Sequence, residues 1–437
     1  MRCAAHHLTP RPANMTGSSP SSRRYIFAAV VVLFFFYYFR FHPTLSGPVE
    51  APLDGTRSGH QAFDPWRWNA TKDRDNHQLT APQCSQAFPE LYRDIDRAVS
   101  YWSSRAKESR ITPASINLDW AGDGGLTAMI YDQQLYITHS RGINHYAHWF
   151  QRHRATLLEI HRAVSTAPEP VPNIEFSIRI NDVVALDNQH PNTTVWAYSR
   201  DIYNPVHDQL WTIPDFNFWA YPGVAGSFQE FQRNALQLGG DFASKIPKVV
   251  WRGTTSFNPE LRLALLQQAE GQPWSAIARV DEQSSDHTQR ISIEDHCLFQ
   301  FAVHTEGATW SGRLKYLLSC NSVVLIHPLR YMTHIYHLLR SQGSDQNYVA
   351  VEANFKDLSG KVEGLLKDRE RAMRIADSAA RTFRDRYATP AAQTCYLRRL
   401  FSAWRDVSFE PDPHKYIQES DGTTRRVRRG MTLEEYL

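Results

Sequence analysis

The chain carries little net charge for its length. Its 437 residues include 48 Lys and Arg against 45 Asp and Glu, which gives a formal net charge of +3. Proteins that bind nucleic acid over a broad surface need a large positive excess, so this balance excludes bulk nucleic-acid binding. Glycine and proline number only 21 and 24, too few for a collagen-like or largely disordered chain. We therefore expect a folded protein, and its length predicts two packed domains.

Four widespread catalytic signatures are absent from the sequence. It contains no G-x-G-x-x-G, G-x-x-x-x-G-K-[ST], H-E-x-x-H or G-x-S-x-G segment. Their absence argues against a dinucleotide oxidoreductase, a P-loop enzyme, a zinc peptidase and an α/β-hydrolase.

Signals for a bound metal are weak. Two histidine pairs and two D-x-D tripeptides have suitable spacing, but the histidines lack a third ligand and neither tripeptide follows a buried strand. The residues are His145 with His148, His334 with His337, Asp73 with Asp75, and Asp94 with Asp96. We interpret the histidines as ordinary surface or groove residues and the aspartates as solvated charges. The expected reaction is metal-independent and needs no cofactor.

One long apolar run lies near the N-terminus. Residues 25–39 (YIFAAVVVLFFFYYF) carry no charge and are framed by Arg23, Arg24 and Arg40. As a helix the run spans about 22 Å, shorter than the usual membrane span, so a cleaved signal peptide is the alternative. We favour an uncleaved signal anchor because no convincing cleavage site follows. The excess of arginine before the run predicts a cytosolic N-terminus and a catalytic part in the lumen of the Golgi or endoplasmic reticulum.

Other features agree with a lumenal location. Asn69 and Asn192 begin glycosylation sequons on the predicted lumenal side, whereas Asn14 begins one on the cytosolic side and should stay bare. Four of the five cysteines are also lumenal, an even number in an oxidising compartment. They are Cys84, Cys297, Cys320 and Cys395. From the sequence they allow three pairings.

Composition and periodicity divide the chain into segments. We expect a cytosolic tail (1–24), the anchor (25–39), a stem (40–82), an N-terminal lobe (83–240), a C-terminal lobe (241–408) and a polar tail (409–437). Apolar spacing predicts helices over 88–107 and 144–163, a strand or hairpin over 129–138, and a strand over 174–180. From residue 248 onward strands alternate with helices, which is typical of a parallel sheet covered on both faces.

The segment 306–316 (EGATWSGRLKY) has the features of an anion-binding loop. It follows an apolar strand and opens a predicted helix, with Ser311 placed as the N-cap and Arg313 and Lys315 adding positive charge. Free backbone N–H groups and cations together favour a diphosphate and stabilise it as a leaving group. The alternative is a capped helix with solvent-facing cations.

Several motifs, in order, resemble glycosyltransferase family 90, which includes fungal capsule-associated proteins and Rumi-like animal protein O-glucosyltransferases. The matching stretches are Trp251-Arg-Gly253, Pro259-Glu-x-Arg262, Asp295-His-Cys297, Ser311-x-Arg-x-Lys-Tyr316 and Cys320-x-Ser-Val-Val. Upstream, residues 172–182 (PNIEFSIRIND) resemble the segment that carries the family's catalytic base. Residues 213–219 (IPDFNFW) resemble an aromatic segment near the acceptor.

This resemblance implies a GT-B-like α/β fold, with two Rossmann-type lobes and a UDP-sugar in the cleft. The implied reaction moves glucose or xylose to a hydroxyl of a glycan or protein by an inverting single displacement, with Asp182 as the base. The implied donor-binding residues are Thr254, Ser256, Arg262, Thr309, Ser311 and Arg313, and the implied acceptor-side residues are Phe218 and Trp219. The resemblance also pairs Cys297 with Cys320 and Cys84 with Cys395.

The position of Asp182 agrees with that role. It follows an apolar strand at the carboxyl end, where open α/β sheets bind ligands, and a carboxylate there can accept the proton of an attacking hydroxyl. Taken alone, the same aspartate would be interpreted as the cap of a turn. The alternative functions are a non-catalytic lumenal sugar- or UDP-binding protein of the same fold and a metal-dependent transferase. The presence of Asp182, Arg262 and Arg313 together argues against the non-catalytic protein.

Overall fold

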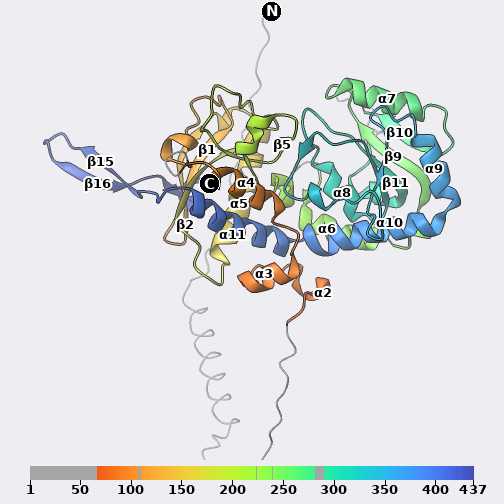
Figure 1. Ribbon diagram of the computed structural model, residues 1–437, viewed down its shortest axis with the longest axis horizontal. Coiled ribbons are helices and arrows are strands. Elements are labelled where there is room, and N and C mark those ends of the chain that lie inside the picture. Colours follow the sequence, from red (N-terminus) through yellow and green to blue (C-terminus); the bar gives the residue numbers. More distant parts are fainter. Residues whose placement is uncertain (1–65, 107–109, 223, 239, 281–289) are drawn as a thin grey trace, which may run out of the picture. The chain divides into compact units, whose positions relative to one another are not determined.

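Two β-sheets organise the chain in this computed structural model, which describes residues 66–106, 110–222, 224–238, 240–280 and 290–437 (Figure 1). The described residues belong to a single compact unit. The predicted anchor at 25–39 and the sequon at Asn14 lie outside them. Among the described residues, no helix has both the length and the apolar character needed to cross a membrane.

The C-terminal lobe is built on a parallel sheet in the order β10-β9-β11-β12-β14. Its strands are β9 (Ile246–Gly253), β10 (Ser275–Arg279), β11 (Phe299–His304), β12 (Val323–Ile326) and β14 (Val349–Ala350). In chain order this is 2-1-3-4-5, a doubly wound arrangement whose switch point lies between β9 and β11. Strands β11 and β12 are buried along almost their whole length, as expected for parallel strands covered on both faces. The predicted parallel α/β pattern is confirmed.

Helices surround this parallel sheet in Figure 1. They are α6 (Phe228–Leu238), α7 (Pro259–Ala269), α8 (Arg313–Ser319), α9 (Leu358–Lys367) and α10 (Arg369–Thr382). The buried side chains of α9 and α10 pack with those of β9, β11 and β12 in one apolar cluster. This cluster holds the sheet rigid beneath the loops that leave its carboxyl edge.

The N-terminal lobe contains a mixed sheet in the order β17-β2-β1-β3-β4-β6. Its strands are β1 (Gly125–Tyr131), β2 (Gln134–Arg141), β3 (Ile174–Arg179), β4 (Trp196–Ala197), β6 (Trp211–Thr212) and β17 (Met431–Thr432). Asp132 and Gln133, with φ of 48° and 62°, form a two-residue turn of the type that suits the twist of antiparallel strands. Because β1 pairs antiparallel with both neighbours, this lobe is not the fully parallel Rossmann-type lobe that the resemblance implied.

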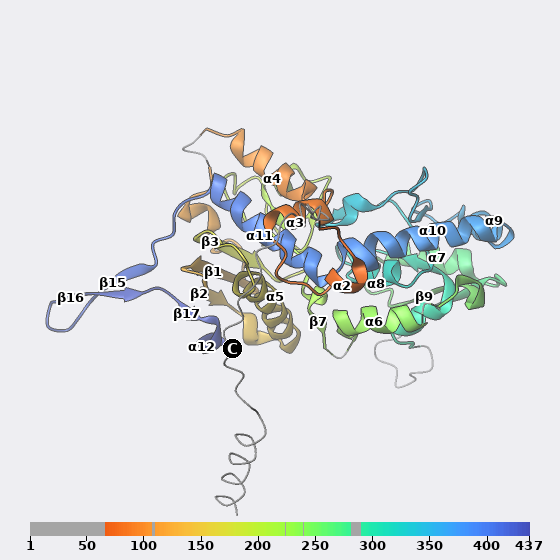
Figure 2. The same ribbon diagram turned by 90° about the horizontal axis from the view of Figure 1, so that it is seen from below.

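Helix α11 (Pro390–Val407) returns to the N-terminal lobe, as the implied pairing of Cys84 with Cys395 requires, although the predicted boundary at 408 includes it in the C-terminal lobe. It packs against α4 (Arg93–Ser103) and α5 (Ala147–Ser165), the two helices predicted in this lobe (Figure 2). Cys395 of α11 forms a disulfide with Cys84 of α3 (Ala81–Ala87), and the second disulfide joins Cys297 to Cys320. Both pairings implied by the resemblance are confirmed.

Part of the predicted stem is folded. Residues 66–82 include the short helix α2 (Ala70–Asp73). The ring of Trp68 lies 4.8 Å from that of Phe88 in an edge-to-face contact, and Leu79 is completely buried. The polar composition of this stretch concealed the few apolar side chains that hold it on the N-terminal lobe.

The predicted polar tail is also folded. Residues 409–437 form the hairpin of β15 (His414–Gln418) and β16 (Thr424–Arg428), and then β17 joins the edge of β2. Arg429 donates to both carboxylate oxygens of Glu175, which is buried on β3. This long-range ion pair and strand pairing explain why local composition failed to predict the tail.

Candidate active site

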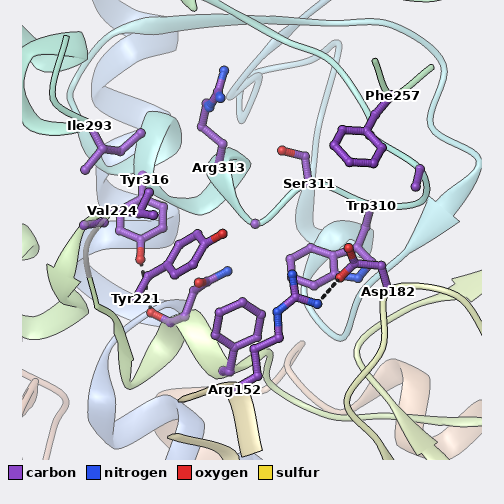
Figure 3. A pocket seen from close by; sticks show the side chains of 16 residues that line it. Arg152, Asp182, Tyr221, Val224, Phe257, Ile293, Trp310, Ser311, Arg313 and Tyr316 are labelled. Atoms are coloured by element: carbon purple, nitrogen blue, oxygen red, sulfur yellow. Dashed lines mark hydrogen bonds and ion pairs between the residues drawn. The ribbon is translucent and has the colours of Figure 1, made fainter. Parts of the chain in front are cut away.

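A cavity of about 330 Å³ lies where the two lobes meet (Figure 3). The N-terminal lobe contributes Arg152 of α5, Asp182 after β3, and part of η5 (Phe216–Phe218). The C-terminal lobe contributes the loop that follows β11 and Phe257 from the loop that follows β9. The cavity therefore lies at the switch point of the parallel sheet, where doubly wound folds bind their ligands.

The loop between β11 and α8 differs from the prediction at its end. Helix α8 begins at Arg313 with Gly312 as its N-cap, and no side chain caps it. Ser311 is therefore not the cap and instead lines the cavity. The turn is closed by the backbone, since the Leu314 amide donates to the Ser311 carbonyl at 3.2 Å. A Cβ atom at Gly312 would lie 2.2 Å from Nδ2 of Asn217, so a glycine is required for this close approach.

Two arginines place positive charge at the carboxyl edge of the sheet. Arg313 donates to the carbonyl of Arg252, and burial, followed by the charge of Arg262, lowers its pKa to about 10. Arg262 donates to the carbonyls of Thr254 and Glu306 at 2.7 and 3.2 Å. Arg313 lines the cavity that the described residues form, whereas Arg262 does not line it, and an anion bound near them would relieve their mutual repulsion.

The other predicted donor-binding hydroxyls, besides that of Ser311, occupy different positions. Those of Thr254 and Ser256 hydrogen-bond each other at 2.6 Å, and neither lines the cavity as it is formed by the described residues. The buried hydroxyl of Thr309 donates to the main-chain carbonyl of Asp182 at 2.9 Å. Thr309 thus connects the loop of the C-terminal lobe to the segment that carries the predicted base.

Asp182 faces the cavity in an ion pair that the sequence did not predict. Nη1 of Arg152 donates to its Oδ1 at 2.8 Å, while the two side chains are 15% and 42% exposed for Arg152 and Asp182. The guanidinium of Arg152 also lies over the ring of Phe216, 4.8 Å from its centre. In Figure 3, Arg152 and Arg313 lie on opposite sides of the cavity, with Asp182 beside Arg152.

Sequence comparison identifies the family of this chain. Residues 81–419 match the family described as glycosyl transferase family 90. The chain belongs to glycosyl transferase family 90. It is 26% identical over 246 residues to protein O-glucosyltransferase 3 of Rattus norvegicus, covering 55% of this chain and 43% of that protein. It is 25% identical over 295 residues to protein O-glucosyltransferase 2 of Danio rerio, covering 64% and 53%. The chain thus spans about half the length of these curated relatives.

The prediction that Lys315 adds positive charge to the anion-binding loop is wrong. Its Nζ lies 2.7 and 2.9 Å from the two carboxylate oxygens of Asp215, and the two side chains are only 3% and 5% exposed. Residues two apart on a helix point to nearly opposite sides. Arg313 can therefore line the cavity while Lys315 faces the interior and neutralises a buried carboxylate.

The predicted acceptor-side aromatics do not line the cavity formed by the described chain. Phe218 is buried, with Nζ of Lys315 located 4.4 Å from its ring centre. Trp219 is half-buried beneath the guanidinium of Arg162, at 4.0 Å. The tight 3₁₀ turn of η5 directs Phe216 and Asn217 into the cavity instead.

The remaining candidates lie away from the cavity. Asp94 is buried, in contrast to the predicted solvated charge, and pairs with Arg97 and Arg200 at 2.9 and 3.0 Å. Burial opposes its ionisation, but the charges of these arginines hold its pKa below the usual range. In the described ranges no group of three or more His, Cys, Asp or Glu side chains is arranged to hold a metal. Asn69 and Asn192 are both exposed.

Proposed function

We propose that the protein transfers a sugar, glucose or xylose, from a UDP-sugar to a hydroxyl of a glycan or protein acceptor. The observation that carries this proposal is the placement of Asp182 and Arg313 on one interlobe cavity, each contributed by a different lobe. Family membership, the cavity at the switch point and the two-lobed α/β architecture support a GT-B-like binding mode.

The proposed mechanism is a single displacement. The acceptor oxygen attacks C1 of the sugar, its proton passes to Asp182, and the bond between C1 and the β-phosphate oxygen breaks to release UDP. Arg152 occupies Oδ1 of Asp182 and leaves Oδ2 for the acceptor hydroxyl. Arg313 offsets the charge that develops on the diphosphate. Because guanidinium groups supply this charge, the scheme needs no metal ion, and attack opposite the leaving group inverts the anomeric centre.

The proposal extends to the compartment. Two disulfides join Cys84 with Cys395 and Cys297 with Cys320, which is typical of proteins that fold in an oxidising lumen. We place the catalytic part in the lumen of the Golgi or endoplasmic reticulum, held by the apolar run at 25–39 as a single-pass signal anchor.

The decisive test replaces Asp182 with asparagine, which keeps the shape but cannot accept the acceptor's proton. UDP release from UDP-glucose or UDP-xylose, with serine-peptide or mannan acceptors, should fall by about 10² to 10⁴ for Asp182→Asn. UDP affinity should stay unchanged, because the diphosphate site belongs to the other lobe. The control is Asp187→Asn, whose side chain is 61% exposed.

Three results would contradict the scheme. One is turnover of Asp182→Asn within a few-fold of wild type, another is loss of activity with a chelator, and the third is retention of configuration in the product. A wild-type chain that binds UDP but never turns over any UDP-sugar would support the non-catalytic alternative instead.

A further inference from the structure

Three residues that line the cavity carry buried polar atoms without a hydrogen-bond partner among the described residues. The atoms are Nε of Arg152, Oδ1 of Asn217 and Nε1 of Trp310. Asn217 and Trp310 are 3% and 7% exposed. Folded proteins pair more than about nine in ten of their buried polar groups, and an unpaired group costs roughly 1 to 3 kcal/mol. The described residues contain other unpaired buried atoms, among them Nε1 of Trp196 and of Trp211, but these three belong to side chains that line one cavity, which favours a ligand that supplies the partners.

Contacts within the protein hold the three residues in place. Arg152 is held by Asp182, and the ring of Trp310 packs edge-to-face against Tyr198 with centroids 5.9 Å apart. The backbone of Asn217 is fixed at both ends, since its amide donates to Asp215 at 2.9 Å and its carbonyl accepts from Tyr316 at 3.3 Å. The residues that carry the polar atoms are therefore held in place at the cavity wall before a ligand binds.

Their location corresponds to the sugar ring in the proposed mechanism. Asn217 lies against Gly312, directly before Arg313. Trp310 belongs to the same loop, in which the hydroxyl of Thr309 donates to the main-chain carbonyl of Asp182 at 2.9 Å. Arg152 is bonded to that carboxylate. The three side chains thus line the same cavity as Arg313 and Asp182, which is where C1 must be held in the proposed mechanism.

Their chemistry matches hydroxyl groups. Two of the atoms belong to N–H donors and the third is an amide oxygen acceptor. A sugar hydroxyl can both accept from an N–H and donate to an amide oxygen, whereas a phosphate would find no complement in an amide oxygen. We propose that Arg152, Asn217 and Trp310 form the subsite that binds the hydroxyls of the transferred sugar. This inference rests on the proposed function and deepens it.

The test compares ligands that differ only by the sugar. Calorimetry on the full chain measures the affinities of UDP, UDP-glucose and UDP-xylose for wild type, Trp310→Phe and Asn217→Ala. Each variant should bind UDP within about twofold of wild type but bind the preferred UDP-sugar roughly tenfold more weakly, as expected for one lost hydrogen bond. Trp310→Phe should also leave the melting temperature of the free protein unchanged, because the deleted N–H is unpaired there.

The matched control is Trp211→Phe. Nε1 of Trp211 is likewise buried without a partner in the described chain, but its ring packs on Trp404 in the interior of the N-terminal lobe, 5.3 Å away. This change should leave both UDP and UDP-sugar affinities unaltered.

The outcomes distinguish a failure of the proposed function from a failure of this inference. If wild type binds neither UDP nor UDP-sugars, the proposed function fails. If wild type binds them but the two variants keep full UDP-sugar affinity, the inference alone is overturned. A raised KM for acceptor with unchanged donor affinity would assign the three residues to the acceptor, and equal losses for UDP and UDP-sugar would refute a sugar-specific role.

Discussion

Replacement of Lys315 by methionine tests whether this lysine stabilises the fold or binds the anion. Lys315 on α8 is bonded to both carboxylate oxygens of Asp215, and both side chains are almost fully buried. Methionine keeps the apolar stem and removes the charge, so the variant leaves the carboxylate of Asp215 buried without its partner. An unpaired buried charge costs about 3 to 5 kcal/mol of folding free energy.

The expected size of the effect follows from burial. Lys361 makes an ion pair of the same length, 2.7 Å to Asp357, but its side chain is 39% exposed. Exposed pairs contribute only about 0.2 to 1 kcal/mol, so Lys361→Met is the matched control. The double variant Lys315→Met with Asp215→Asn removes both charges and should regain most of the loss, because asparagine can still accept the hydrogen bond from the Asn217 amide.

Thermal unfolding followed by near-UV circular dichroism measures the difference. At about 2 °C per kcal/mol, the melting temperature of Lys315→Met should fall by roughly 6 to 10 °C, and that of Lys361→Met by about 2 °C or less. UDP affinity should change little. If Lys315→Met melts like the control and instead loses UDP binding, the lysine serves the anion site and the structural argument fails.

Two further predictions concern ionisation and topology. Burial, followed by the charge of Asp215, raises the pKa of Glu159 from 4.5 to about 8. Between pH 4.5 and about 8 the folded chain keeps the Glu159 carboxyl protonated, while the unfolded chain releases its proton. The free energy of unfolding of the wild type should therefore fall as the pH rises through this range. Glu159→Gln should flatten this dependence in melting curves from pH 5 to 8; an unchanged slope would refute it. Asn69 and Asn192 should carry glycans that endoglycosidase removes, and identical mobility of Asn192→Gln and wild type would contradict the lumenal assignment.

The parallel sheet could be predicted from sequence because its strands are buried on both faces. Such strands appear as short apolar runs with few polar interruptions, and the helices between them fix the parallel direction. The strand that precedes Asp182 was predicted from its β-branched residues instead, and β3 is buried along its whole length although it carries Glu175, Ser177 and Arg179. The disulfide pairing, in contrast, came only from the family resemblance, because the cysteine positions alone allow three pairings.

The partners of the site residues could not be predicted. Periodicity predicted the helix that contains Arg152, but it does not say which side chain of that helix reaches the end of β3. Arg313 and Lys315 are close in sequence and carry the same charge, and only their angular separation on α8 assigns one to the cavity and the other to the interior. Trp310 and Asn217 lie in two segments that the sequence singled out, 306–316 and 213–219, but neither residue was itself a candidate, because a buried polar atom without a partner is recognised only in three dimensions.

The geometry between base and leaving group depends on contacts that cross the two lobes. The hydroxyl of Thr309 donates to the main-chain carbonyl of Asp182, and β5 (Arg200–Asp201) pairs with β13 (Tyr331–Met332). Each contact joins one lobe to the other, so the loop bearing Arg313 and the strand end bearing Asp182 are placed by a shared framework. A displacement reaction requires attacking and leaving atoms in line, and small misplacements are costly. Thr309, which the resemblance assigned to donor binding, thus also bonds the segment that carries the proposed base.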